Sequence, residues 1–246
     1  MTPETWKRLL RRSAADAGMA LFGPLLGNQA GDGCFVIGRM AQSLDGFIAT
    51  SKGESYWISG PEDIAHTHRL RALCDAVVVG AGTVRADDPQ LTTRLVEGPS
   101  PVRVIIDPGR RLTPDRRVFQ GGPPTLVLCA TDRITADRPG TAEAVAVSCG
   151  PDGMAPGAII QALAARGLRR IFIEGGGITI SRFLTAGWLD RLHVTIAPVL
   201  IGSGVPAFPL PPTTALGEAR RFDWTVHRVG RDILLDIALD RRPLPP

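Results

Sequence analysis

Short apolar runs of strand length alternate with helical segments along most of the chain, and this alternation is the strongest constraint on its fold. The runs DAVVVG, VRVIID, TLVLCA and RRIFIEG are apolar over nearly their whole length. Strands of this kind are buried on both faces, as in a mostly parallel sheet that helices cover on both sides. Helices are predicted over residues 61–73, 156–166 and 178–186. The sequence therefore predicts an α/β fold.

The two ends of the chain differ from this pattern. Residues 219–239 alternate apolar and polar side chains on either side of Gly230, which predicts an antiparallel hairpin with one solvated face. Residues 1–33 are predicted to be an N-terminal extension, with a short basic amphipathic helix over 5–20 and a glycine-rich loop over 23–33. The main domain is expected to occupy residues 34–246.

The composition bounds the class of protein. The chain has 246 residues, of which 44% are hydrophobic and 21% charged, so it can bury a full core. The net charge of +4 is spread along the chain, which is typical of a solvated surface and would also suit an anionic small molecule. The charge is too diffuse for nucleic-acid binding. No run has the length of a signal-peptide core or a membrane span, so we expect a soluble, cytoplasmic protein.

Metal and nucleophile chemistry find no support in the sequence. The four cysteines form no C-x-x-C pair and lie in or beside apolar runs, which predicts reduced, buried thiols. His66 and His68 lie two residues apart in a predicted helix, so they do not share a face. No H-E-x-x-H motif and no Ser/His/Asp arrangement occurs. We expect no metal site.

A turn of three glycines, Gly175 to Gly177, follows a predicted strand and precedes a predicted helix. Glycines at such a place often serve only a tight turn. They can also bring bare N–H groups and the positive end of a helix dipole up to a phosphate. The Lys-Ser/Thr pair of a P-loop is missing, so the turn alone leaves both interpretations open.

Other polar residues follow the ends of predicted strands, where ligands of α/β sheets bind. Thr83 and Asp87 are four residues apart, so one helical turn aligns them. Glu174 ends a buried strand, where a carboxylate needs a partner. Trp57 lies in a Gly/Ser-rich loop and suits either core packing or stacking on a ligand. Together these residues suit a nucleotide cofactor and a phosphorylated substrate.

Four short motifs occur in a fixed order, and their combination is specific for one class of protein. They are SLDG, GES-x-WI, GTV-x-x-DDP-x-L-x-x-R and EGG, within MAQSLDGFIATSKGESYWIS, LRALCDAVVVGAGTVRADDPQLTTR and IFIEGGGITISRFL. In this combination the chain resembles the reductase domain of the riboflavin-biosynthesis deaminase–reductase proteins, from about Phe35 to about Leu239. The resemblance implies a dihydrofolate-reductase-like three-layer fold and a homodimer. It also implies NADPH-dependent reduction of the ribosyl group of 5-amino-6-(5-phosphoribosylamino)uracil to the ribityl product.

The resemblance also implies a set of site residues. The substrate-binding positions are Ser55, Arg71, Leu91, Arg94 and Glu174. The cofactor-binding positions are Ala41, Trp57, Thr83, Asp87, Gly175, Gly176, Gly177, Ile178 and Thr179. Asp87 and Glu174 are the catalytic candidates, with Ser55 or a water as other sources of the proton. Arg71 and Arg94 suit phosphate or polar clamps, because guanidinium forks match phosphate oxygens.

The chain departs from the bifunctional relatives in two ways. Residues 1–33 are too short for their zinc deaminase domain, so that activity is expected to be absent or supplied by another chain. Pro108 stands where those relatives often carry a small hydroxyl residue near the cofactor. The neighbouring Arg110 and Arg111 suit either the 2′-phosphate of NADPH or a charged surface. The alternatives are a reductase of the same fold acting on another carbonyl or imine, and a catalytically silent nucleotide-binding paralogue.

Overall fold

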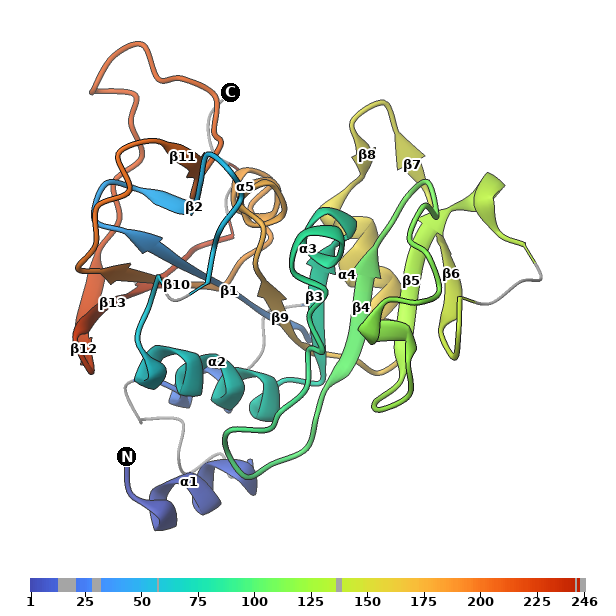
Figure 1. Ribbon diagram of the computed structural model, residues 1–246, viewed down its shortest axis with the longest axis horizontal. Coiled ribbons are helices and arrows are strands. Elements are labelled where there is room, and N and C mark those ends of the chain that lie inside the picture. Colours follow the sequence, from blue (N-terminus) through green and yellow to red (C-terminus); the bar gives the residue numbers. More distant parts are fainter. Residues whose placement is uncertain (13–20, 28–31, 57, 136–138, 242, 244–246) are drawn as a thin grey trace.

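One twisted sheet runs through the protein. The computed structural model describes residues 1–12, 21–27, 32–56, 58–135, 139–241 and 243. Its nine-stranded sheet has the order β12 (Trp224–Val229), β13 (Asp232–Ala238), β10 (Arg191–Ala197), β1 (Phe35–Ser43), β9 (Arg170–Glu174), β3 (Ala76–Gly80), β4 (Val102–Ile106), β5 (Thr125–Ala130) and β6 (Glu143–Val147). Figure 1 shows this order across the molecule.

The strand directions confirm the predicted fold class. All pairs from β10 to β6 are parallel, whereas β13 is antiparallel to both β10 and β12. Two small antiparallel pairs lie outside the main sheet and were not predicted: β2 (Phe47–Thr50) with β11 (Gly204–Pro206), and β7 (Cys149–Gly150) with β8 (Gly153–Met154). Their strands have two to four residues, too few to show a periodic pattern.

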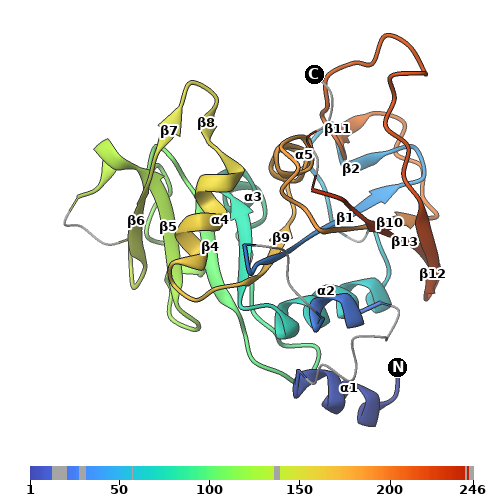
Figure 2. The same cartoon turned by 180° about the vertical axis from the view of Figure 1, so that it is seen from behind.

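Helices cover both faces of the sheet. They are α1 (Pro3–Leu10), α2 (Pro61–Leu73), α3 (Ala81–Asp87), α4 (Pro156–Ala164) and α5 (Gly177–Thr185). Side chains of α4 and α5 share one apolar cluster, and side chains of α1, α2 and α3 share another on the opposite face. In Figure 1 α4 lies behind β4 and β5, and in Figure 2 it lies in front of them. The alternating pattern had predicted these layers.

The interface between α2 and the sheet is unusually polar. Buried on α2 are Asp63, His66, Thr67, His68 and Arg71. Asp63 forms an ion pair with Arg39 of β1 and accepts a hydrogen bond from Thr195 Oγ1 of β10 at 2.7 Å. The rings of His66 and His193 share a hydrogen bond of 3.0 Å. Buried charges are retained in folded proteins when they are paired, and these pairs fix how α2 sits on the sheet.

Two expectations about local structure change. The N-terminal helix begins at Pro3, where Thr2 accepts a hydrogen bond from Thr5 N, and ends at Leu10. Residues 13–20 of the expected helix lie outside the described residues. Cys149 is exposed, because it lies in the short outer strand β7, while Cys34, Cys74 and Cys129 are buried free thiols. The division into 1–33 and 34–246 stays a prediction.

Candidate active site

The turn between β9 and α5 brings the ends of two helices together. Gly176 is the N-cap of α5, with φ of +70°, and a Cβ built there would lie 2.9 Å from Thr83 Oγ1 of α3. A Cβ built on Gly80, the N-cap of α3, would lie 2.8 Å from Thr179 Oγ1 of α5. The third residue of each helix therefore faces the N-cap of the other. Bare N–H groups and hydroxyls meet here at the carboxyl edge of the sheet.

The neighbouring residues of the turn have different surroundings. A Cβ on Gly177 would meet the carbonyl oxygens of Pro206 and Ala207 at 2.8 and 2.6 Å, so this glycine serves close packing. Gly175 has φ of +79°, and a Cβ there would meet only Thr83 Cγ2 at 3.8 Å. Ile178 is 70% exposed at the start of α5. Gly177 thus serves close packing, and phosphate binding by the rest of the turn stays a prediction.

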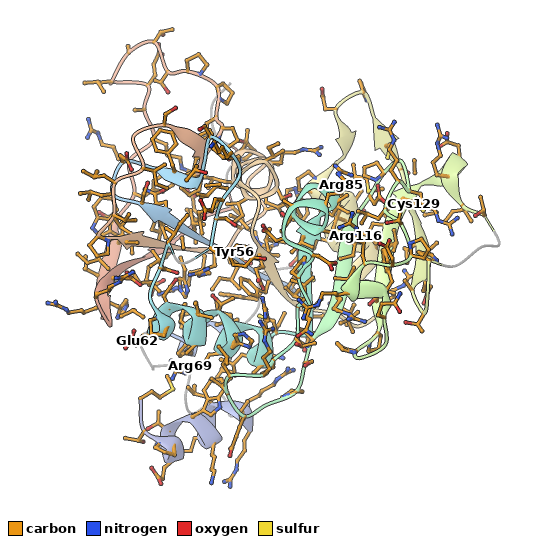
Figure 3. All side chains as sticks on the ribbon, viewed as in Figure 1. Tyr56, Glu62, Arg69, Arg85, Arg116 and Cys129 are labelled. Atoms are coloured by element: carbon orange, nitrogen blue, oxygen red, sulfur yellow. The ribbon has the colours of Figure 1, made fainter. Side chains whose placement is uncertain are left out.

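Ser55 and Asp87 lie together at the C-terminal end of α3, one turn beyond Thr83. Ser55 Oγ donates to Asp87 Oδ1 at 3.3 Å, and Tyr56 Oη donates to the carbonyl of Asp87 at 3.5 Å. Burial raises the pKa of Asp87, an effect that the Ser55 hydrogen bond opposes in part. Figure 3 shows Tyr56 between the two halves of the sheet and Arg85 on α3. Trp57 lies outside the described residues.

Arg71 and Glu174 form a two-pronged ion pair between α2 and the end of β9. Arg71 Nε donates to Glu174 Oε2 at 2.7 Å, and Arg71 Nη2 donates to Glu174 Oε1. Arg71 Nη1 donates to the carbonyl of Thr92 at 2.9 Å. All three nitrogens of this guanidinium are engaged within the protein. The pair therefore positions Glu174 and the loop after α3.

Arg94 lies close to this ion pair. Its backbone N–H donates to His68 Nδ1 at 3.0 Å. In the described part of the chain, no carboxylate lies within ion-pair distance of its side chain. Burial lowers the pKa of Arg94, and so do the nearby charges of Arg71 and Arg117. An excess of positive charge at this place favours a bound anion.

The structure brings most of the expected site residues into one continuous region. Thr83 and Asp87 share α3, Thr83 faces Gly176, and Glu174 precedes the turn and binds Arg71. Ala41 lies two residues past Arg39, the β1 partner of Glu174, toward the same edge of the sheet. Leu91 is the exception, because its side chain is 1% exposed in the core under α2. Only its backbone, with φ of 55°, is available to a ligand.

Two residues of this region were not among the expected ones. Gly80 ends an apolar strand and begins a helix, as Gly176 does, and that shared context could have revealed it. His68 was considered only as a metal ligand, yet it is 1% exposed and anchors the backbone of Arg94. No local sequence signal marks this role, because it depends on a contact across 26 residues.

A second concavity lies farther along the same edge of the sheet. It has a volume of ≈ 470 Å³ beyond the ends of β4 and β5. Arg110 and Arg133 line it, together with Gly109, Leu112, Pro114, Asp132, Thr135 and Pro139. Parallel strands end along one edge, so a long ligand that starts at the glycine turn can extend toward this pocket.

Comparison with known proteins assigns the family. The model of the RibD C-terminal domain matches residues 34–235. A 2,5-diamino-6-ribosylamino-4(3H)-pyrimidinone 5′-phosphate reductase of Methanothermobacter thermautotrophicus is 38% identical over 175 residues, which cover 68% of this chain and 79% of that protein. The chain belongs to the RibD C-terminal domain family, the reductase domain of riboflavin-biosynthesis proteins. It is therefore an oxidoreductase.

Solved structures agree with this assignment. A deaminase/5-amino-6-(5-phosphoribosylamino)uracil reductase of Thermotoga maritima superposes with a TM-score of 0.74 at 30% identity. The match covers 84% of this chain and 56% of that one, so the chain spans little more than half of that protein. Dihydrofolate reductase of Enterococcus faecalis, 13% identical, superposes with a TM-score of 0.50 over 85% of this chain and 98% of its own. This last likeness concerns the fold alone, and it confirms the predicted dihydrofolate-reductase-like architecture.

Membrane-spanning helices and metal-binding clusters are both absent from the described residues. None of their helices is long and apolar enough to cross a membrane. Within the same residues, no group of three or more His, Cys, Asp or Glu side chains is arranged to hold a metal ion.

The anchor between His68 and Arg94 predicts a loss of stability in acid. Burial, with the charges of Arg71 and Arg94, lowers the pKa of His68 from 6.5 to about 4. As the pH falls below 6.5, the unfolded chain therefore binds a proton that the folded chain does not. We expect full stability above this pH and a loss toward pH 4 of about 1.4 kcal/mol per pH unit for this group.

The variant His68→Asn keeps an acceptor and removes the titration. Urea unfolding of both proteins from pH 7.5 to pH 4 measures the difference. The unfolding free energy of the variant should fall less steeply with acid than that of the wild type. If the unfolding free energies of the two proteins fall equally with pH, the assignment of this proton to His68 is contradicted.

Proposed function

We propose that the protein reduces the ribosyl group of 5-amino-6-(5-phosphoribosylamino)uracil to the ribityl product with NADPH. The observation that carries this proposal is the meeting of two helix N-termini at Gly80 and Gly176, beside the cation Arg94 and the Arg71–Glu174 pair. One part of the region suits the phosphates of a dinucleotide, and the other suits a phosphorylated sugar. A cytoplasmic location, expected from the sequence, belongs to the same proposal.

The cofactor side is formed by the glycine turn and two threonines. Gly80 and Gly176 leave room for the hydroxyls of the two threonines. All four residues are partly exposed, so we expect their backbone N–H groups and hydroxyls to contact phosphate oxygens. Nine residues of α5 point the positive end of their dipole here. The residues present therefore fit a dinucleotide, which supplies a hydride when bound.

We assign the preference for NADPH over NADH to the pocket beyond β4 and β5. Arg110 and Arg133 line this pocket, and guanidinium groups match a 2′-phosphate. The carboxylate of Asp132 also lines it and lies 3.5 Å from Arg133 Nε. Arg110, whose Nη1 donates to Thr135 Oγ1 in the same pocket, and Arg133 are the cations that we expect to contact the 2′-phosphate. For Arg110 this agrees with one of the two interpretations of its sequence position.

On the substrate side, the residues act mainly by orientation. Arg94 binds the phosphate, the Arg71–Glu174 pair presents Glu174 to sugar hydroxyls, and Asp87 provides the proton. Asp87 suits this role because burial raises its pKa and Ser55 holds its carboxyl group in place. The ribose ring opens first: the C1′–O4′ bond breaks as O4′ takes the N–H proton, which leaves a C1′=N imine. C1′ of this imine then accepts the hydride, and the nitrogen takes up the proton from Asp87 as the C=N π bond breaks.

The identity of the pyrimidine is tested by turnover. The names of the two related reductases differ in the base, an aminouracil in one and a diaminopyrimidinone in the other. Oxidation of NADPH, followed by absorbance, should be fast with the aminouracil and slow with the diaminopyrimidinone. The reverse order would assign the diamino compound instead. Tight NADPH binding without turnover on either compound would favour a reductase of another carbonyl or imine.

We also propose that the protein is a homodimer formed through the exposed apolar side chains of the β12–β13 hairpin. Val226 pairs with Leu235 and Trp224 with Ile237, so these side chains share one face of the hairpin. Trp224 is 56% exposed, Val226 57% and Ile233 47%. An exposed apolar sheet face of this kind is typical of protein interfaces, and a second copy offers the same face in return.

Adding a methyl group at Gly176 should weaken cofactor binding. In Gly176→Ala the new Cβ would lie 2.9 Å from Thr83 Oγ1, inside the proposed phosphate cradle. We expect the Kd for NADPH, measured by fluorescence titration, to rise about 10-fold or more. Gly167→Ala is the matched control, because φ there is +77° and no atom lies within 4 Å of its Cβ. Equal changes in the Kd for NADPH in the two variants would show that Gly176 serves only the turn.

Removing the guanidinium of Arg94 should affect the substrate and spare the cofactor. Loss of a charge-assisted phosphate contact costs on the order of 2–4 kcal/mol, so kcat/KM of Arg94→Ala should fall about 30-fold to 1000-fold. The Kd for NADPH should change less than about twofold. Arg166→Ala, on an exposed arginine paired with Glu143, is the control. An unchanged kcat/KM in Arg94→Ala would rule out the phosphate clamp.

A charge on the hairpin should separate the proposed dimer. Light scattering after size-exclusion chromatography should give twice the chain mass for the wild type and the single mass for Val226→Asp. Val205→Asp places the same charge on an exposed valine of β11 and should remain dimeric. A wild-type protein with the mass of one chain would contradict the dimer.

A further inference from the structure

The N-terminal helix packs against the loop that carries Arg94. We call residues 1–12 and 21–27 the N-terminal brace, and residues 91–98 the clamp loop. Trp6 of the brace is 7% exposed, and its indole Nε1 donates to the carbonyl of Glu97 in the clamp loop at 2.9 Å. Figure 1 shows α1 beside α2, and Figure 3 places Arg69 on the side of α2 that faces α1.

The far end of the clamp loop fits tightly between the two helices. Gly98 has φ of +136°, and a Cβ built there would lie 2.7 Å from Ala72 Cβ of α2 and 3.0 Å from Leu10 Cδ2 of α1. This end of the loop therefore occupies a place that α1 and α2 define together. The brace is itself fixed, since Leu9, Phe22 and Leu25 are buried in the core cluster of this face.

Other contacts anchor the near end of the clamp loop. Arg71 holds the carbonyl of Thr92, and His68 accepts the N–H of Arg94. Thr93 N donates to Ser100 Oγ at 3.0 Å. Arg94 therefore lies between anchors from α2 on one side and the Trp6 anchor on the other. A loop held at both ends presents its cation without an ordering cost when a ligand binds.

We propose that the N-terminal brace presets the clamp loop, with Trp6 as a positioning residue that sets substrate affinity through Arg94. This inference rests on the proposed role of Arg94 as the phosphate clamp. The brace lies before residue 34, where the match to the family domain begins. It therefore adds a determinant of substrate binding from outside the residues that match the reductase domain.

The variant Trp6→Phe tests the anchor, because it keeps an aromatic ring in the core and removes the N–H donor. Loss of one hydrogen bond predicts a rise of about fivefold in KM for the phosphorylated pyrimidine. We expect kcat and the Kd for NADPH to stay within about twofold, and amide hydrogen exchange in residues 92–98 to become faster. Lys7→Ala, on an exposed residue of α1, should leave all four quantities unchanged.

The outcomes separate this inference from the proposed function. An unchanged KM in Trp6→Phe, with a raised KM in Arg94→Ala, would overturn the brace and leave the clamp. If Arg94→Ala also has no effect on KM, the proposed phosphate clamp is wrong. In that case the brace is still tested by amide hydrogen exchange, and an unchanged rate in residues 92–98 of Trp6→Phe would overturn it. A parallel loss of kcat, cofactor affinity and melting temperature in Trp6→Phe would show a merely structural role and would also overturn it.

Discussion

The hydrogen-bonded pair of Arg71 and Glu174 connects the parts on which the site depends. Glu174 ends the central strand β9 directly before the glycine turn, and Arg71 belongs to α2 on one face of the sheet. The third nitrogen of the same guanidinium holds Thr92 in the clamp loop. One side chain thus fixes the distance between the proposed cofactor cradle and the proposed phosphate clamp. A planar fork with donors in a fixed geometry does this better than a flexible ammonium group.

The polar surface beneath α2 extends this connection across the sheet. Arg39 binds Asp63, His66 binds His193, and Asp236 accepts from Arg191 at 2.5 and 2.6 Å. Burying such groups is costly, and replacing them with apolar residues often costs little stability. Here these polar pairs fix the position of α2, because an apolar helix face would allow α2 to shift along the sheet. A shift of α2 would move His68 and Arg71 together, and with them the cation Arg94.

The sequence predicted the layers of helices and sheet, but it did not predict which side chains of the site pair with one another. Apolar runs such as DAVVVG identified the parallel strands, and Gly230 identified the hairpin, because these patterns are local. The pairing of Arg71 with Glu174 spans 103 residues, so no local pattern revealed it. Arg71 was expected to contact the substrate, and it is instead bound to Glu174, one of the expected catalytic carboxylates. Leu91 has a buried side chain and a backbone φ of 55°, and neither feature is visible in a local sequence pattern. The resemblance supplied residue positions, and the fold supplied their partners.

Hydride transfer is the central claim, and isotope labelling tests it most directly. NADPH that carries deuterium at the transferable position of C4 would be incubated with the protein and 5-amino-6-(5-phosphoribosylamino)uracil, and the product would be examined by mass spectrometry and NMR. The account predicts one deuterium per product molecule, bonded to C1′ of the ribityl chain. A product without deuterium, or with deuterium at any other carbon, would contradict it.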